Sequence, residues 1–197
     1  MPPSLPRFCS IIICSLALAL AGCEGAPKFR STDITGADFG KALALTGHDG
    51  KPRVLEDFRG KLVVLFFGFT HCPDICPTTL ADMAAVMKTL GADAARVQVL
   101  FVTVDPQRDT PEVLAKYVPA FDPGFLGLSG DAAATQRAAK EFRIFYDQRP
   151  ASAPGAYTVD HSAQSYVLDA KGRLRLFVRH DRIAQDLASD LRALLRD

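Results

Sequence analysis

The hydrophobic positions of this chain fall into short continuous runs that are separated by segments with helical spacing. Residues 62–69 and 97–104 are almost entirely apolar and rich in β-branched and aromatic side chains, which is typical of strands buried on both faces. Apolar residues between 80 and 90 recur at helical spacing, and residues 109–121 begin with capping residues followed by Pro111. The pattern predicts a strand–helix–strand–helix order.

Shorter elements are predicted on either side of these four. They are a possible edge strand at 42–45, a short strand at 125–128, an alanine-rich helix at 132–142, a loop at 150–154, a hairpin of strands 163–168 and 174–178, and a closing amphipathic helix at 183–195. Strands that alternate with helices and end in a hairpin and a helix predict an α/β fold with a central mixed sheet flanked by helices.

The first 22 residues have a pattern of their own. They hold one charge, Arg7, followed by an apolar run from 8 to 20 that is too short to span a bilayer comfortably but is typical of a signal peptide. The run ends in Leu20-Ala21-Gly22-Cys23, which resembles the lipobox of bacterial lipoproteins. An ordinary signal peptide or an uncleaved anchor is the alternative. The resemblance implies a mature chain that begins at a lipidated Cys23.

These boundaries give three expected segments: a lipoprotein signal peptide (1–22), a polar linker (23–34) and one globular domain (35–197). The protein is then exported and held at a membrane surface by lipid, facing the periplasm or the extracellular side. Removal of residues 1–22 leaves 22 basic and 22 acidic residues, so there is no basic footprint for nucleic acid. A monomer is expected.

Only one pair of cysteines is expected to remain available for chemistry in the mature domain. Cys9 and Cys14 leave with the signal peptide and Cys23 is committed to lipid, which leaves Cys72 and Cys76 for the domain. The pair follows the strand at 62–69 and precedes a helix, which is the thioredoxin-like arrangement. A helix N-terminus favours thiolates, and a disulfide closing so short a loop would remove little chain entropy. Soft sulfur ligands favour Cu(I) or zinc, and the sulfurs alone leave that choice open.

The four histidines differ in their suitability as a third ligand. His161 follows Asp160 at the start of the predicted strand 163–168, where its backbone would be held firmly. His48 and His180 are expected to be solvated surface residues. His71 adjoins Cys72, and neighbouring residues on a turn rarely face one point. By spacing alone, a hydrogen-bonded structural role for His161 is at least as good as a ligand role.

Three segments together resemble a known family. The run Gly68-Phe69-Thr70-His71-Cys72-Pro73-Asp74-Ile75-Cys76-Pro77 resembles the signature of the Sco/SenC family, copper proteins that assist assembly of the dinuclear copper centre of cytochrome c oxidase. Residues 104–111 and 159–162 are similar to two further family segments. The resemblance implies one copper, as Cu(I) or Cu(II), on Cys72, Cys76 and His161. Asp160 would then orient His161. Asp74 would tune the thiols or meet a partner, with a solvated turn residue or helix cap as the alternative.

The resemblance also implies a metallochaperone rather than an enzyme. A docked partner, the copper-bearing subunit of cytochrome c oxidase or another copper protein, would take the ion by ligand exchange, and the metal-free pair could close into a disulfide. The main alternative is a thiol–disulfide oxidoreductase that reduces the partner's cysteines. Thioredoxin-type enzymes have two residues between their cysteines and a cis-proline nearby, whereas this chain has three residues and no such proline. A peroxiredoxin-like peroxidase is disfavoured because Phe69 and Pro73 replace its upstream proline and threonine. A purely structural or sensory module would leave His161 unexplained.

Overall fold

The computed structural model describes residues 27–152 and 155–197. The expected signal peptide, Cys23 and the first part of the linker lie outside the described residues. The strands are β1 (Thr32–Asp33), β2 (Ala44–Gly47), β3 (Pro52–Val54), β4 (Leu62–Gly68), β5 (Val97–Thr103), β6 (Leu126–Ser129), β7 (Tyr146–Pro150), β8 (Tyr157–His161), β9 (Ser165–Leu168) and β10 (Leu174–Val178).

The helices are α2 (Ile75–Leu90), α3 (Pro111–Tyr117), α4 (Ala132–Glu141) and α5 (Ala188–Leu194). Short 3-10 turns cover Leu55–Phe58, Gly91–Arg96, Val118–Ala120 and His180–Arg182, and a π-helical turn covers Ile183–Leu187. Within the described ranges, no helix combines the length and apolar character needed to cross a membrane.

Eight strands form one mixed sheet in the order β1-β10-β9-β4-β5-β6-β2-β3. The central strands β4, β5 and β6 are parallel, and β9 joins β4 antiparallel. Every residue of β4 is buried, as its continuous apolar run predicts for a strand covered on both faces. The carboxyl ends of β4 and β5 lie side by side because Gly68 is paired with Thr103.

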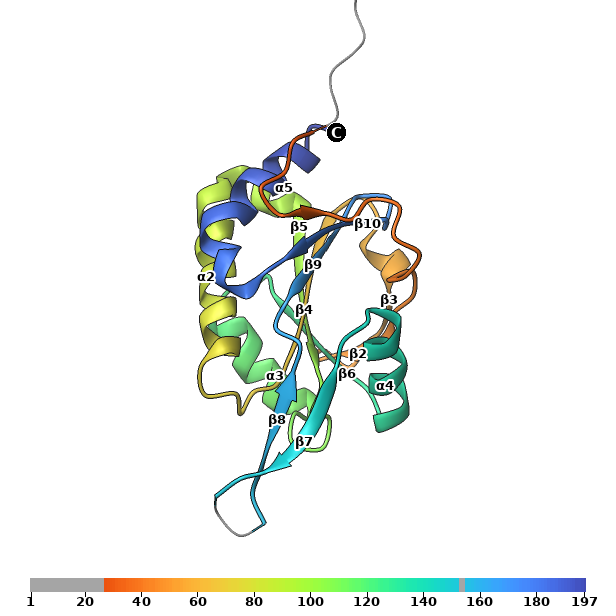
Figure 1. Cartoon of the computed structure of the whole chain (residues 1–197), viewed down its shortest axis with the longest axis vertical. Helices are drawn as coiled ribbons and strands as arrows, with labels where there is room; N and C mark the ends of the chain where they lie inside the picture. The colour runs from red at the N-terminus through yellow and green to blue at the C-terminus, as the bar shows by residue number, and fades with distance from the viewer. Residues whose placement is uncertain (1–26, 153–154) are drawn as a thin grey trace, which may run out of the picture.

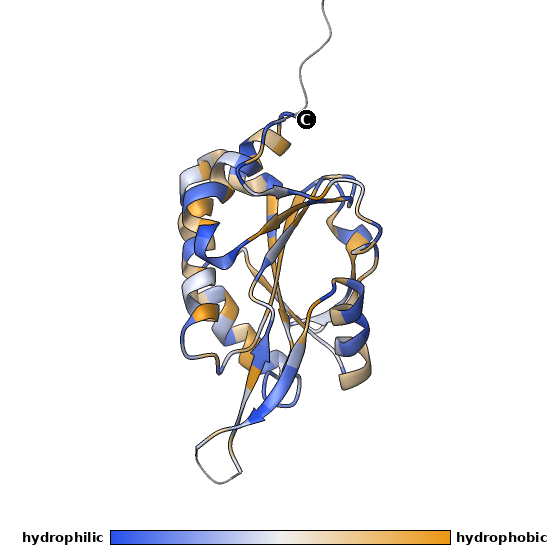
Figure 2. Ribbon diagram, viewed as in Figure 1, coloured by the Kyte–Doolittle hydropathy of each residue, from blue (hydrophilic) through white to orange (hydrophobic). Residues whose placement is uncertain are grey.

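Helices cover both faces of the sheet. In Figure 1, α2, α3 and α5 lie on one side and α4 lies on the other. Figure 2 shows that the inner strands are coloured hydrophobic while hydrophilic residues colour the outer parts of the helices. The α/β architecture with a central mixed sheet, predicted from the alternation of elements, is confirmed.

Several boundaries differ from the sequence prediction. The strand expected at 42–45 is β2 at 44–47, and it is not an edge strand as expected, because it pairs with both β3 and β6. The helix expected over 183–195 begins with a π-helical turn. Residues 32–33, expected in the linker, pair with β10 as the short strand β1. Arg30 and Ser31 are also tied to the domain, because their backbone N–H groups donate to the buried carboxylate of Asp190 at 2.8 and 2.9 Å.

The hairpin of β7 and β8 is the largest departure from the prediction. The sequence pattern gave only a loop at 150–154, and His161 was expected to begin the strand at 163–168. His161 is instead the last residue of β8, paired with Tyr146 of β7. These two strands form a sheet of their own, separate from the eight-stranded sheet, and project from one end of the molecule (Figure 1). The predicted hairpin at 163–178 is present as β9 and β10.

Candidate metal centre

The cysteine pair lies on the turn that joins β4 to α2. The Cys72 N–H donates to the Phe69 carbonyl at 3.3 Å, so the chain reverses directly after the strand. Cys76 lies in the first turn of α2 and is fully buried, whereas Cys72 is half-buried. The Cys76 N–H donates to the Cys72 sulfur at 3.4 Å. One sulfur is thus accessible to a docking molecule and the other belongs to the core.

Gly68 makes room for the buried sulfur. A Cβ atom at this position would lie 2.8 Å from the Cys76 Sγ and 2.9 Å from a ring carbon of Phe101. Real Cβ atoms do not approach that closely, so a side chain here would displace the sulfur or the ring. Gly68 is also the first residue of the motif that contains the two cysteines. A glycine that ends an otherwise bulky buried strand was the available signal for a close approach.

His161 is 85 residues from Cys76 in the sequence but lies beside it in the fold. Its Nε2 lies 3.4 Å from the Cys76 Sγ, and its Nδ1 lies 2.9 Å from the Ser162 carbonyl oxygen. Since a carbonyl can only accept, Nδ1 carries the proton and the Nε2 lone pair faces the sulfurs. Two phenylalanine rings pack against the imidazole, Phe69 edge-on at a centroid distance of 5.7 Å and Phe66 at 6.2 Å.

Cys72, Cys76 and His161 therefore form one cluster. Their two sulfurs and one imidazole nitrogen all lie within 4.8 Å of one another. Soft thiolates and an imidazole suit copper or zinc, and three ligands leave one side open. The structure brings together the three residues that the sequence singled out, and His71 is not in the group.

The two thiols have opposite acidities. The Cys72 pKa is lowered to about 3, chiefly because the Cys76 thiol donates a hydrogen bond to its sulfur, and also because the N–H groups of Asp74 and Cys76 donate to it. The pKa of Cys76 is raised because it is the donor in that hydrogen bond and because it is buried. Cys72 is the thiolate and Cys76 is the thiol of the metal-free pair, and both are free cysteines.

Asp160 differs from the expectation, whereas the exposed Asp74 fits the alternative of a solvated turn residue. Asp160 was expected to orient His161, but the partner of the ring is the Ser162 carbonyl, and the Asp160 carboxylate lies 3.3 Å from the Arg149 Nε. Asp160 and His161 are consecutive residues of β8, so their side chains point to opposite faces of the strand. Asp74 is exposed at the start of α2 and makes no side-chain capping bond there. Its backbone N–H, rather than its carboxylate, favours the Cys72 thiolate.

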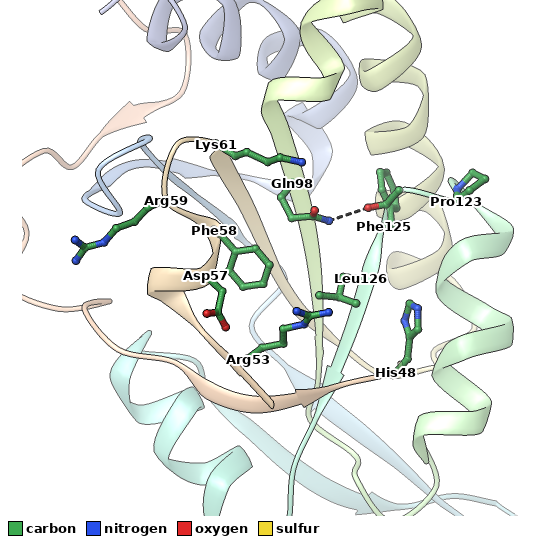
Figure 3. A pocket seen from close by; sticks show the side chains of 11 residues that line it. His48, Arg53, Asp57, Phe58, Arg59, Lys61, Gln98, Pro123, Phe125 and Leu126 are labelled. Atoms are coloured by element: carbon green, nitrogen blue, oxygen red, sulfur yellow. Dashed lines mark hydrogen bonds between the residues drawn. The ribbon is translucent and has the colours of Figure 1, made fainter. Parts of the chain in front are cut away.

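The remaining histidines lie elsewhere. His180 is exposed, as expected. His48 was expected to be solvated, but it is half-buried and its Nδ1 accepts from the Gly127 N–H at 2.9 Å. It lines a hollow of about 330 Å³ together with Arg53, Lys61 and Gln98 (Figure 3). This hollow lies at the amino-terminal ends of β4 and β5, whereas the cysteines follow the carboxyl end of β4. The role of His48 is to hold β6 against the turn after β2.

Comparisons with known proteins agree with this arrangement. The SCO1/SenC family model matches residues 31–196. The mitochondrial SCO2 homologue of Mus musculus is 39% identical over 152 residues, a match that covers 76% of this chain and 60% of the mouse protein. The chain thus spans less than two thirds of that relative.

Solved structures are similar over almost their whole length. Bradyrhizobium japonicum ScoI with copper bound is 37% identical, with a TM-score of 0.73 over 79% of this chain and 99% of that one. A SCO1/SenC family lipoprotein from Bacillus anthracis is 26% identical, with a TM-score of 0.70 over 86% of this chain and 98% of that one. The thioredoxin-like fold predicted from the sequence is confirmed by this likeness.

Proposed function

The chain belongs to the SCO1/SenC family, and from that premise we propose that it binds one copper ion on Cys72, Cys76 and His161 and delivers it to a copper protein. The observation that carries the proposal is the convergence of two sulfurs and a free imidazole nitrogen within 4.8 Å from segments 85 residues apart. The copper-bound ScoI of B. japonicum, 37% identical, supports copper over zinc.

The three ligands have distinct tasks in this proposal. Cys72 is already a thiolate and half-buried, so it is the ligand through which copper arrives and to which an acceptor's ligand comes closest. Cys76 loses its proton on metal binding and holds the ion from the core side. The His161 Nε2 completes the site from the hairpin. Three ligands leave room for an incoming ligand before an old one departs, which favours transfer by exchange.

The acceptor that we propose is the copper-bearing subunit of cytochrome c oxidase, whose dinuclear copper centre this family helps to assemble. We further propose that residues 1–22 are a signal peptide and that Cys23 carries lipid. The protein would then be a monomer held at the outer side of a membrane, with a linker that ends near Arg30. The lipobox-like run Leu20-Ala21-Gly22-Cys23 and the B. anthracis lipoprotein support this placement.

The test of the copper site is a titration of the reduced protein with Cu(I) and Cu(II) under anaerobic conditions. We expect one tight copper per chain, with Cys72→Ser, Cys76→Ser and His161→Ala each weakening binding by at least a hundredfold. His180→Ala is the matched control and should bind as the unaltered protein does. Copper bound equally well without His161 or without either cysteine would contradict the assignment.

A second function has one observation in its favour. The lowered pKa of Cys72 and the buried partner thiol of Cys76 are also what thiol–disulfide exchange requires. The His161→Ala variant separates the two functions, because exchange needs only the sulfurs. Rapid reduction of a protein disulfide by this variant, together with no copper binding by the unaltered protein, would favour the oxidoreductase.

A further inference from the structure

The loop from Asp105 to Asp109, between β5 and α3, contains buried charged side chains, which is unusual for a connection at the surface. The carboxylates of Asp105 and Asp109 are fully buried, and the Arg108 side chain is only 25% exposed. Buried carboxylates are unfavourable unless hydrogen bonds satisfy them. Their partners include Thr70, on the segment that supplies the cysteines, and Tyr157, on the strand that supplies His161.

Asp109 holds the cysteine turn. One carboxylate oxygen accepts from the Thr70 hydroxyl at 2.6 Å, and the other accepts from the Thr70 N–H at 2.9 Å and from the Thr103 hydroxyl at 2.6 Å. Thr70 is two residues before Cys72, and Thr103 is the last residue of β5. The carboxylate thus fixes the start of the turn to the end of the neighbouring strand.

Asp105 and Arg108 hold the hairpin in the same way. The Arg108 Nη1 donates to the Tyr157 carbonyl at 2.9 Å, and the Tyr157 hydroxyl donates to Asp105 Oδ1 at 2.8 Å. The Arg108 Nε donates to Asp105 Oδ2 at 2.5 Å, and the guanidinium carbon lies 3.8 Å from the centroid of the Tyr157 ring. Tyr157 is the first residue of β8, and His161 is the last.

The hairpin needs this attachment. β7 and β8 pair only with each other in the described part of the chain, and an isolated two-stranded hairpin is marginally stable in water. Charge-assisted hydrogen bonds and stacking of arginine on an aromatic ring are strong enough to fix such a strand. Arg108 also lies 5.9 Å from the ring centroid of Phe69, which packs edge-on against His161.

From these contacts we infer that the Asp105–Asp109 loop is the positioning element of the metal centre, and that its Arg108–Asp105–Tyr157 clamp sets how well the His161 imidazole is presented to copper. The inference rests on the proposed function. Arg108 and Tyr157 are positioning residues, since neither belongs to the group of three candidate ligands. Cu(I) is satisfied by two thiolates, whereas Cu(II) depends more on the imidazole, so the clamp affects Cu(II) more.

The test uses the full chain in detergent and the variants Arg108→Met and Tyr157→Phe, with Arg179→Met as a control. Arg179 is 68% exposed and pairs with Asp181 at the surface. We expect Arg108→Met to weaken Cu(II) binding 10- to 100-fold, the range usual for residues that orient a ligand, and to change Cu(I) binding less than threefold. Tyr157→Phe loses one hydrogen bond, so its Cu(II) affinity should lie between those of Arg108→Met and the control.

Two further measurements decide whether the clamp acts through His161. In a His161→Ala background, Arg108→Met should cause no additional loss of Cu(II) affinity, because the imidazole through which Arg108 acts is then absent. In metal-free protein, amide hydrogen exchange of residues 157–161 should rise at least tenfold in Arg108→Met and Tyr157→Phe while β4 and β5 stay protected.

Unchanged exchange in β8, or a Cu(II) loss that persists without His161, would overturn the inference. If the unaltered chain binds no copper, the proposed function fails, and the exchange measurement still decides whether the clamp holds the hairpin. If Arg108→Met does not fold, Tyr157→Phe decides in its place.

Discussion

At the scale of single residues, the two cysteines differ in protonation: Cys76 keeps its proton and Cys72 is a thiolate. Cys72 is the acceptor of the hydrogen bond between the two cysteines and is half-buried, whereas Cys76 is the donor and is fully buried. Thiolates, not thiols, react with electrophiles and bind metals. Of the two cysteines in the described part of the metal-free chain, Cys72 is therefore the reactive one at neutral pH.

Alkylation should report this directly. The Cys72 pKa falls from 9.0 to about 3, so Cys72 stays ionised between pH 5 and 8 and its rate with iodoacetamide should stay nearly constant over that range. An ordinary thiol gains about tenfold per pH unit below its pKa. Peptide mass spectrometry follows each cysteine, and Cys76 should react at least tenfold more slowly.

The Cys76→Ala variant is the control for that experiment. It removes the hydrogen bond that lowers the Cys72 pKa most, so a rate that rises with pH should return. A Cys72 rate that already rises tenfold per unit in the unaltered protein would show that the thiolate is not stabilised.

Gly68 offers a second test at this scale. In Gly68→Ala, the new methyl group would lie 2.8 Å from the Cys76 sulfur, so the sulfur or Phe101 must move. We expect a loss of about 1–3 kcal/mol in the free energy of unfolding, as overpacking of a core usually costs, and at least tenfold weaker copper binding. Urea unfolding and copper titration measure the two effects.

Gly124→Ala is the matched control, because its only close neighbour is the end of the flexible Asp122 side chain at 3.2 Å. It should bind copper as the unaltered protein does. Equal effects of the two substitutions would mean that the room under Cys76 has no special importance.

At the scale of secondary-structure elements, the sequence was sufficient to predict those elements whose burial produces a clear pattern of apolar residues. The apolar runs at 62–69 and 97–104 became β4 and β5, and the helical spacing after Cys76 became α2. β7 and β8 could not be predicted in this way, because Tyr146-Asp147-Gln148-Arg149-Pro150 has half-buried and exposed residues without an apolar alternation. Two strands that pair outside the core leave little signal in hydrophobicity.

The candidate site shows the same division. The cysteines were placed by local spacing, and His161 was selected through the family resemblance. Its predicted position at the start of the strand 163–168 was wrong, because His161 ends β8 instead. Asp160 was chosen as the orienting group because it is adjacent in sequence, but the clamp on the hairpin comes from Arg108, 49 residues before Tyr157. Contacts of that range depend on the packing of the whole fold, which a single sequence pattern does not contain.

The attachment of the N-terminal segment can be tested at the same scale. Asp190 of α5 is fully buried and accepts from the backbone N–H groups of Arg30 and Ser31. Asp190→Ala leaves both donors without this partner, so we expect a loss of about 2 kcal/mol in the free energy of unfolding. Hydrogen exchange of residues 30–33 should increase, while that of β8 should not.

Asp93→Ala is a suitable control, since Asp93 makes an exposed pair with Arg96 at 3.6 Å, and such pairs contribute little. Equal stability of Asp190→Ala and the unaltered protein would show that β1 and its preceding residues are held by other contacts.

At the scale of the whole molecule, the two ends of the domain have different tasks. The described chain begins close to the C-terminus at one end of the long axis, and the β7–β8 hairpin and the first turn of α2 lie toward the other end (Figure 1). If lipid is carried by Cys23, as we propose, the metal centre faces away from the membrane. Six residues lie between Cys23 and Arg30, and the seven steps from Cα to Cα reach at most about 25 Å.

This arrangement predicts that the linker affects delivery but not binding. Deletion of residues 24–27 should leave copper affinity within twofold and slow transfer to a membrane-embedded acceptor severalfold, because the anchored domain covers less distance. Transfer to a soluble copper chelator should be unchanged and is the control. Slower transfer to both acceptors would point to damage in the domain itself.

The separation of the hairpin sheet from the main sheet has a consequence for how the protein responds to change. Because β8 shares no ladder hydrogen bonds with the eight-stranded sheet, a movement of His161 would break none of the hydrogen bonds of that sheet. We therefore expect substitutions at exposed positions of the hairpin to change the rate of copper release more than the melting temperature of the protein.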